Sequence, residues 1–259
     1  IIRILSIKSK FGINYPIIGV NNAKSKHFFD NRYGTGQSTI HGLLKTLGIL
    51  IAGKQFVVCG YGWVGKGVSS CLRGLGARVT ITEVDPIKAL EAHMDGFNVQ
   101  RLKETLPKGD CFITCTGQRD VITKYDFPIL KNGAFLANAG HFDVEIDVDY
   151  LYAQNNPPVQ MRPYVECFDI NGKKINLIAK GRVINLVGGE GNPSEVMDLS
   201  FSNQLLSILY ITKNYKNLGK DLHDVPNKID EKVAKVALSS FGIKIDNLTK
   251  EQIEYHTKG

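Results

Sequence analysis

The stretch FVVCGYGWVGKG, residues 56–67, decides the fold. Its first four residues are apolar and predict a strand buried on both faces, and a helical pattern begins before the stretch ends. Between strand and helix lies Gly60-x-Gly62-x-x-Gly65, the arrangement that a diphosphate needs. Gly60 permits a tight turn, Gly62 leaves room for the phosphates, and Gly65 lets the helix pack close to the strand. The N-terminus of this helix would offer free N–H groups and a partial positive charge to the anion.

Strand and helix patterns continue to alternate after this stretch. Strands are predicted at residues 56–59, 78–83, 111–115 and 134–138, and helices at 64–75, 86–95 and near 125–130. Nearly all-apolar strands that alternate with helices are typical of a parallel sheet with crossover helices. The sequence therefore predicts an α/β fold, with a doubly wound parallel sheet of the Rossmann type.

The residues at the strand ends predict which dinucleotide binds. The second strand ends at Glu83, about twenty residues after the loop, where a carboxylate can accept hydrogen bonds from ribose hydroxyls. Its charge would repel a 2′-phosphate, so NAD is favoured over NADP, although Lys88 lies nearby. Residues 114–117 and 138–141 follow later strands at the same sheet edge, where they are either plain turns or cofactor contacts. Two such ends at matching positions favour cofactor contact.

Other elements are predicted outside this alternating region. They are a helix at about residues 38–50, a β-hairpin at 159–187 with the turn Asn171-Gly172, a helix from Asn192 to about 213, and a helix near 228–238. In the third of these, Asn192 is the expected N-cap and Pro193 the first helical residue. Its apolar face is expected to hold Val196, Leu199, Leu206 and Leu209.

Composition excludes several classes of function. The net charge is +7, but the basic residues are scattered and form no arm for nucleic acid. The cysteines number five with no CxxC pair, which predicts neither a disulfide framework nor a metal site. No stretch approaches the roughly 20 apolar residues of a membrane span. We therefore expect a cytoplasmic protein, without nucleic acid or membrane partners. Because the chain begins at Ile1 inside an apolar stretch, we expect it to be part of a longer protein.

Five stretches resemble the S-adenosylhomocysteine hydrolase (adenosylhomocysteinase) family, in order and in spacing. They are residues 26–38, 60–67, 83–86, 138–147 and 181–204, which together extend over almost the whole chain. The segments FDNRYGTGQS and NAGHFDVEID are highly specific, whereas the glycine loop is shared by many dehydrogenases.

The resemblance implies reversible, NAD-dependent hydrolysis of S-adenosylhomocysteine to adenosine and homocysteine, by a homo-oligomer that is a dimer or a tetramer. NAD oxidises the 3′-hydroxyl, the ketone acidifies the 4′ C–H, homocysteine is eliminated, water adds, and reduction gives adenosine. The cofactor supplies the hydride chemistry, so the protein must supply positioned acids and bases.

The same resemblance implies roles for single residues. Lys26 and Asp30 would contact the ribose hydroxyls, and Lys26 would move the 3′-hydroxyl proton, which a lysine does near neutral pH only when its pKa is depressed. Asn31 would lie between substrate and nicotinamide, and His141 at the reacting ribose. The implied catalytic residues are Lys26, Asp30, Asn31 and His141, and the implied substrate-binding residues are Lys26, Asp30 and Asn192. The implied NAD-binding residues are Asn31, Gly60, Gly62, Trp63, Val64, Gly65, Lys66, Gly67, Glu83, Lys88, Thr116, Gly117, Ala139, Gly140, His141, Asn185 and Asn192. Taken without the resemblance, Asp30 could be a helix or turn cap and His141 a buried structural histidine.

The chain also departs from the family. It lacks the large N-terminal substrate portion, so the isolated chain is expected to be inactive. Asn192 stands where the family usually has histidine, and the tail ends at Thr257-Lys258-Gly259 without the Lys/Tyr-bearing extension of many relatives. The expected domains are a substrate-domain remnant at 1–36, the NAD-binding domain at 37–191, a returning substrate-domain helix at 192–224 and an oligomerisation tail at 225–259.

Two other functions fit the glycine loop. One is an NAD-dependent dehydrogenase of 2-hydroxy acids, and the other is a noncatalytic NAD-binding paralogue. The cluster of Lys26, Asp30 and Asn31 before the loop favours the hydrolase, because a simple dehydrogenase has no reason to carry it.

Overall fold

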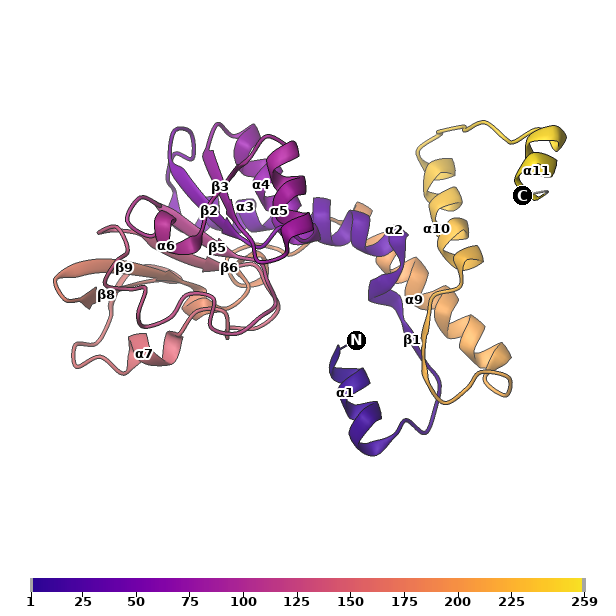
Figure 1. The fold of residues 1–259 in the computed structure, drawn as a ribbon, viewed down its shortest axis with the longest axis horizontal. Helices are drawn as coiled ribbons and strands as arrows, with labels where there is room; N and C mark the ends of the chain where they lie inside the picture. Colours follow the sequence, from indigo (N-terminus) through magenta and orange to yellow (C-terminus); the bar gives the residue numbers. More distant parts are fainter. Residues whose placement is uncertain (1, 258–259) are drawn as a thin grey trace. The chain divides into compact units, whose positions relative to one another are not determined.

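The computed structural model describes residues 2–257 of the chain, which form two compact units (Figure 1). One unit is Lys26–Asp198 and holds the large sheet, and the other combines Ile1–Ser25 with Leu199–Gly259. Ile1, Lys258 and Gly259 lie outside the described residues, so the expected domains at 1–36 and 225–259 are described only in part. The expected domain boundaries stay predictions.

The described part of the sheet unit contains an eight-stranded sheet with the order β4-β3-β2-β5-β6-β9-β8-β7. Its strands are β2 Gln55–Cys59, β3 Arg78–Thr82, β4 Asn98–Val99, β5 Cys111–Thr114, β6 Phe135–Asn138, β7 Val159–Arg162, β8 Val165–Ile170 and β9 Lys173–Ile178. From β4 to β9 every neighbouring pair is parallel, whereas β8 and β7 are antiparallel additions. The parallel strands follow the 3-2-1-4-5-6 order of dinucleotide-binding sheets. The predicted doubly wound α/β fold is confirmed.

Two apolar cores lie on the two faces of this sheet. The helices of the unit are α3 Thr35–Leu47, α4 Trp63–Gly74, α5 Pro86–Met94, α6 Leu102–Thr105, α7 Val148–Tyr152 and α8 Ile184–Val187. Val58 faces the core that contains Leu72 of α4, and its neighbour Val57 faces the core that contains Leu151 of α7. Alternation along the strand thus buries both faces, and Figure 1 shows α4 and α5 on one side of the sheet and α7 on the other.

Glycines let α4 approach its neighbours more closely than any other residue would. Gly60 has a left-handed backbone (φ +102°), and a Cβ on Gly65 would overlap the carbonyl oxygen of Gly60. A Cβ on Gly67 would overlap the carbonyl oxygen of Arg32, which lies in the π-helix η2, His27–Gly34. The helix α4 is therefore pressed against the end of β2 on one side and against η2 on another.

Two predictions between residues 120 and 190 are wrong in part. The expected helix near 125–130 is a series of turns, because Pro128 has no N–H to continue helical bonding. The hairpin at 159–187 is confirmed only as β8 and β9, joined by Asn171 and Gly172 with φ of +54° and +80°. It ends at residue 178, since Ala179 and Lys180 adopt left-handed backbones that no strand can continue.

The helix after Gly191 is α9, Ser194–Asn214, and its start differs from the prediction. Asn192 does not cap it, because the Asn192 amide is bonded instead to residues of η2, α3 and α8. Of the expected apolar face, Leu199 is buried, Val196 and Leu206 are half-buried, and Leu209 is exposed. The buried face of α9 instead carries Leu199 with Ser200, Asn203 and Ser207.

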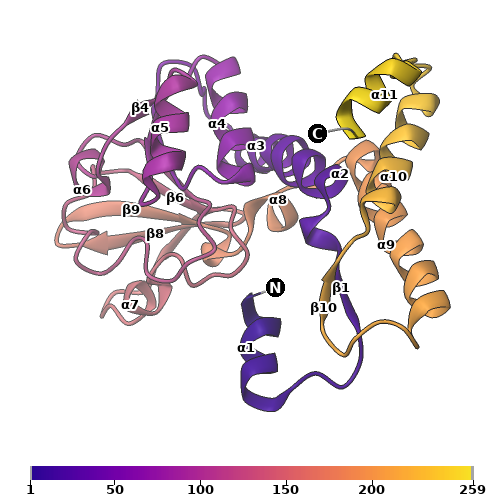
Figure 2. The same cartoon turned by 45° about the vertical axis from the view of Figure 1, so that its right-hand side comes forward.

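The second unit is held by a short sheet and by one buried polar cluster. Its elements are α1 Ile2–Phe11, β1 Ile17–Gly19, η1 Val20–Asn22, the start of α2 Lys24–Lys26, most of α9, β10 Leu222–Asp224, α10 Asn227–Ser240 and α11 Lys250–Thr257. Figure 2 shows β1 beside β10, with which it pairs in parallel. Asp230 accepts from the backbone N–H groups of Lys24 and Ser25, and Asn203 donates to the Ser25 hydroxyl at 2.8 Å. The predicted helix near 228–238 is confirmed as α10. Within residues 2–257, no helix combines the length and apolar character that crossing a bilayer requires.

The close approach of α4 to η2 can be tested by adding one methyl group. We expect Gly67→Ala to lower the free energy of unfolding by about 1–3 kcal/mol, the usual cost of overpacking. Gly74→Ala in the same helix is the matched control, because its Cβ would meet no atom within 4 Å. The control should leave stability unchanged or raise it by up to about 1 kcal/mol. Urea unfolding followed by circular dichroism measures both variants, and equal stability of the two would contradict the tight contact.

Candidate cofactor and substrate site

A cavity of about 590 Å³ lies at the carboxyl ends of β2, β3 and β5. It is lined by Cys59, Gly60, Gly62, Thr82, Glu83, Val84, Asp85, Lys88, Arg101, Leu102, Cys115, Thr116, Gln118, Arg119, Asp120 and Val121. The chain order of the strands reverses between β2 and β5, and this is the point at which open α/β sheets bind ligands.

The glycine loop has the geometry of a diphosphate cradle. The Gly60 N–H donates to the Thr82 carbonyl at 2.8 Å, which ties the loop to the end of β3. No atom lies within 4 Å of an ideal Cβ on Gly62, so the space beside that residue is open. The helix α4 begins at Trp63, and its N-terminal N–H groups have no partner within the helix. Open space and backbone donors together suit an anion.

Glu83 has more partners than the sequence indicated. Its carboxylate accepts from the Tyr61 N–H at 3.0 Å, the Val84 N–H at 2.6 Å and the Asp85 N–H at 3.1 Å. These bonds fix the loop against β3, and a carboxylate still has lone pairs for a ribose hydroxyl. The charge of Lys88 is paired with Asp85 at 3.5 Å. The backbone N–H groups of Lys88 and Ile87 lower the pKa of Asp85, so a carboxylate stays opposite Lys88.

Two thiols in the cavity are uncharged. Burial raises the pKa of Cys59 to about 12, and burial raises the pKa of Cys115 well above its usual range. Both side chains therefore remain neutral near pH 7 and do not repel a diphosphate.

Glu145 joins the ends of β5 and β6, and sequence reasoning missed this role. The side chain is fully buried, and its carboxylate accepts from the Thr116 N–H at 2.9 Å, the Thr116 hydroxyl at 2.8 Å and the Gly117 N–H at 2.8 Å. A Cβ on Gly140 would overlap the same carboxylate. One buried carboxylate therefore binds the predicted turn after β5 and packs closely against Gly140 in the predicted turn after β6. The sequence did offer one sign of this role, because Glu145 lies within the family-specific segment NAGHFDVEID.

Asn138 fixes the turn that carries His141. Its side-chain oxygen accepts from the Gly140 N–H at 2.7 Å, and its side-chain nitrogen donates to the Phe142 and Gly181 carbonyls at 2.7 and 2.9 Å. His141 is exposed at this turn, so the alternative of a buried structural histidine does not hold.

The π-helix η2 brings Lys26, Asp30 and Asn31 together. The Lys26 ammonium donates to Asn31 Oδ1 at 2.7 Å and lies 3.3 Å from Asp30 Oδ2. A π-turn bonds residue i to residue i+5, which places Lys26 and Asn31 on one face together with the i+4 residue Asp30. Asp30 is only 8% exposed. The predicted catalytic cluster is thus assembled within one short segment.

Asn185 supplies a test of whether NAD fits. Its side-chain oxygen is buried and has no hydrogen-bond partner in the protein. Such an orphaned acceptor costs about 1–3 kcal/mol unless a ligand donates to it. The ribose hydroxyls and carboxamide of NAD are suitable donors, so the residues present fit the cofactor.

Four residues implied to bind NAD lie in the first two turns of α4. Trp63 packs against Phe28, with ring centroids 4.6 Å apart, and the Lys66 ammonium lies 4.5 Å from the Trp63 ring centroid. Lys66 is also paired with Glu91. Val64 packs on the apolar core, and Gly67 faces η2. Their roles in binding NAD stay predictions.

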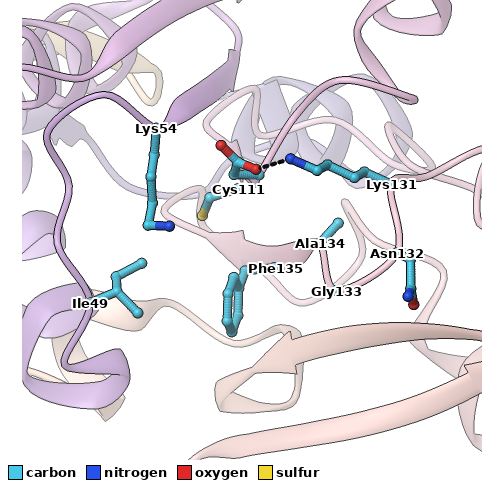
Figure 3. Close-up of a pocket in the computed structure, with 9 residues that line it drawn as sticks. Ile49, Lys54, Cys111, Lys131, Asn132, Gly133, Ala134 and Phe135 are labelled. Carbon is cyan, nitrogen blue, oxygen red and sulfur yellow. Dashed lines mark hydrogen bonds and ion pairs between the residues drawn. The ribbon is translucent and has the colours of Figure 1, made fainter.

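A second cavity of about 110 Å³ lies at the opposite edge of the sheet (Figure 3). Lys54, Cys111 and Phe135 line it, at the amino ends of β2, β5 and β6. In Figure 3 the Lys54 side chain extends into this space, and Lys131 is paired with Asp110. None of the predicted site residues lines it, so it is separate from the candidate site.

Comparison with known proteins places this geometry in a family. A family model described as the NAD binding domain of S-adenosyl-L-homocysteine hydrolase matches residues 31–191. This match confirms the prediction of NAD as the cofactor. Adenosylhomocysteinase of Sulfurisphaera tokodaii is 52% identical over 256 residues, covering 98% of this chain and 62% of that protein. The enzyme of the same name from Nostoc is 48% identical, covering 98% and 60%.

Two further similarities bear on function and fold. An S-inosyl-L-homocysteine hydrolase of Methanosarcina mazei is 47% identical over 250 residues, covering 96% of this chain and 60% of that protein. The chain thus spans about 60% of the length of the curated relatives it matches. The A chain of dipicolinate synthase from Bacillus subtilis has a TM-score of 0.50 at 16% identity, covering 72% of this chain and 57% of that one. At that identity the likeness supports the fold alone.

The buried carboxylate of Glu145 can be tested through cofactor affinity. We expect Glu145→Gln to raise the dissociation constant of NAD about tenfold, since a hydrogen bond to a charged group contributes about 1.5–3 kcal/mol. The chain has one tryptophan, Trp63, whose fluorescence reports binding at the glycine loop. Glu104→Gln, at an exposed position, is the control and should bind NAD like the wild type. A folded Glu145→Gln variant with unchanged affinity would contradict the role.

Proposed function

This chain belongs to the S-adenosyl-L-homocysteine hydrolase family, and we propose that the protein hydrolyses S-adenosylhomocysteine reversibly to adenosine and homocysteine. The observation that carries the proposal is the cluster of Lys26, which directly precedes the π-helix η2, with Asp30 and Asn31 of η2, beside the helix that begins at the glycine loop. A nucleotide loop alone supports cofactor binding, whereas this cluster adds groups that can bind a diol and move a proton.

The cofactor half of the site is proposed to work through backbone groups. Bound NAD would supply the hydride chemistry at C3′ of the substrate ribose. The N–H groups at the start of α4 hold the diphosphate, and Glu83 accepts from the adenosine ribose. The turns fixed by Glu145 and Asn138 line the other half of the dinucleotide site. Asn185 accepts a hydrogen bond with its orphaned oxygen.

The substrate half is proposed to work through η2. Asp30 accepts a hydrogen bond from a ribose hydroxyl, and Lys26, in its neutral amine form, takes up the proton of the 3′-hydroxyl and later gives it back. Asn31 orients Lys26, because Asn31 Oδ1 accepts a hydrogen bond from the Lys26 side-chain nitrogen. His141 is exposed after the end of β6, and its imidazole is the second side chain proposed to contact the reacting ribose.

Family membership supports the hydrolase over a 2-hydroxy acid dehydrogenase, because a simple dehydrogenase has no reason to carry the Lys26 cluster. A noncatalytic NAD-binding paralogue is the alternative outcome of the experiment below.

The purine base of the substrate has two candidates, adenine and hypoxanthine. The S-inosyl-L-homocysteine hydrolases of Methanosarcina mazei and Methanocaldococcus jannaschii are both 47% identical to this chain, within the 46–52% of the adenosylhomocysteinases. Hypoxanthine in place of adenine is therefore the second candidate substrate base.

The proposed protein is a cytoplasmic homo-oligomer. The five cysteines are free thiols, as in a reducing compartment. Phe201, Leu205 and Ile208 are exposed along α9, although each is large and apolar. Such a stripe is typical of an interface.

Lys26 is the residue on which the proposed chemistry depends. In protein that carries the N-terminal substrate portion, we expect Lys26→Ala to reduce NADH formation from added adenosine at least about 100-fold, the usual contribution of a general acid or base. NAD affinity, read from Trp63 fluorescence, should stay within about twofold, since no backbone donor of the loop is lost. Lys24→Ala removes an exposed lysine two residues away and is the matched control.

The same assay separates the candidate functions. Wild-type protein that forms NADH with inosine but not with adenosine would establish the hypoxanthine substrate. Wild-type protein that carries the N-terminal substrate portion and binds NAD, but forms NADH with neither nucleoside, would favour the noncatalytic paralogue. Full NADH formation by Lys26→Ala would refute the assignment of Lys26.

The apolar stripe on α9 predicts assembly. We expect sedimentation velocity to show a dimer or a tetramer, and Leu205→Glu to shift the protein toward monomer because a buried unpaired charge is costly. Lys216→Glu, which adds an acidic residue outside the stripe, is the control. A wild-type protein that is monomeric at every concentration would contradict this proposal.

A further inference from the structure

We propose that Asn192 is a positioning residue that couples the substrate half of the site to the cofactor half, because its amide nitrogen fixes Asp30 and its amide oxygen fixes Asn185. The inference deepens the proposed function and rests on it, since Asp30 and Asn185 are there assigned to substrate and cofactor. It assigns to Asn192 a role through its neighbours instead of direct contact with a ligand.

The donor end of the Asn192 amide holds Asp30. Its nitrogen donates to Asp30 Oδ1 at 2.8 Å and also lies 3.3 Å from the Asp30 carbonyl oxygen and 3.2 Å from the Thr35 hydroxyl. Asp30 therefore uses one carboxylate oxygen for Asn192 and the other for Lys26. With its two oxygens held from opposite partners, the carboxylate cannot rotate freely, and the oxygen toward Lys26 keeps a fixed direction.

The acceptor end of the same amide holds Asn185. Asn192 Oδ1 accepts from the Ser38 hydroxyl at 2.7 Å and from Asn185 Nδ2 at 3.4 Å. Because the nitrogen of Asn185 is turned toward Asn192, its oxygen is the end left over. That oxygen is the buried one without a partner in the protein. The orientation set by Asn192 thus keeps an acceptor available for a ligand.

The topology indicates which part of the dinucleotide meets this acceptor. Val183, two residues before Asn185, forms a bridge with Asn138 at the end of β6. In the sheet, β6 lies on one side of the switch point and β3, with Glu83 after it, lies on the other. A dinucleotide with its adenosine at Glu83 and its diphosphate at Gly62 extends its nicotinamide end toward β6. The carboxamide N–H of the nicotinamide is therefore the expected donor to Asn185.

The Asn192 amide has no capacity left for a ligand. Both of its N–H groups and its carbonyl oxygen are engaged by residues of the same unit. A Cβ on Gly34 would lie 3.0 Å from the Asn192 nitrogen, so the backbone of η2 also packs closely on this amide. A saturated amide between two proposed ligand-binding side chains acts by orienting them.

Two substitutions separate the two ends of the amide. Asn192→Asp keeps an acceptor for Asn185 and Ser38 but replaces the donor to Asp30 with a repelling oxygen. Asn192→Leu has a similar size and removes both ends. Asn155→Asp introduces the same charge change at an exposed position and is the matched control. Urea unfolding of each variant establishes that it is folded.

The readouts are three dissociation constants measured by Trp63 fluorescence. Those of NAD and of ADP-ribose, which lacks the nicotinamide, are measured on the chain, and that of adenosine is measured on NAD-loaded protein that carries the N-terminal substrate portion. We expect Asn192→Asp to weaken adenosine binding at least about tenfold and to keep the ratio of NAD to ADP-ribose affinity within about twofold. We expect Asn192→Leu to weaken adenosine binding and also to lower that ratio about tenfold.

A background without the Asn185 amide separates positioning from general damage. In Asn185→Ala, the further change Asn192→Leu should leave the NAD to ADP-ribose ratio unchanged, because the group that Asn192 orients is already gone. Equal weakening of NAD and ADP-ribose by Asn192→Leu would overturn the cofactor half of the inference. Unchanged adenosine binding by Asn192→Asp would overturn the substrate half. Wild-type protein that carries the N-terminal substrate portion and binds NAD, but never adenosine, would refute the proposed function and the substrate half of the inference. The ratio of NAD to ADP-ribose affinity would still test the cofactor half.

Discussion

The structure depends on two glycines of α4 that leave no side chain between backbones. At Gly65 the helix lies against the Gly60 carbonyl, and at Gly67 it lies against the Arg32 carbonyl. These contacts fix the helix N-terminus, the nucleotide loop and the π-helix relative to one another. Because backbone atoms on both sides resist displacement, the groups proposed for cofactor binding and for proton transfer share one rigid support.

Buried polar side chains form a second level of organisation around this support. Backbone N–H groups at the ends of parallel strands have no partner in the sheet, and leaving them unpaired would be costly. Glu83 and Glu145 accept from such groups after β2, β3 and β5, and Asn138 does so after β6. Each is satisfied by several donors, so the turns at the binding edge are ordered by the protein itself. A site arranged in this way loses little entropy when the dinucleotide binds.

The parts that the sequence predicted are those governed by local rules. Apolar runs identify the strands, and the glycine spacing identifies the loop, because both depend on residues adjacent in the chain. The sequence did not reveal the partners of Glu145 or of Asn192, since Thr116 and Asp30 meet them only through tertiary packing. Ala179 and Lys180, which end the hairpin, adopt left-handed backbone conformations that alanine and lysine rarely take. Tertiary contacts impose these conformations, so the sequence did not predict them. The π-helix was also missed, because bonding to residue i+5 has no strong residue preference.

The electrostatics of the loop follow from the same arrangement. Lys66, the cation within the glycine motif, is paired with Glu91 and lies over the Trp63 ring, and the thiols of Cys59 and Cys115 are neutral. The positive charge nearest to a diphosphate therefore comes mainly from the oriented N–H groups of α4. Backbone dipoles are fixed in direction and need no side-chain ordering, so they favour a ligand by its shape as well as by its charge. The carboxylate of Glu83 can then lie at the same edge of the sheet and select an unphosphorylated ribose, while the N–H groups of α4 bind the diphosphate.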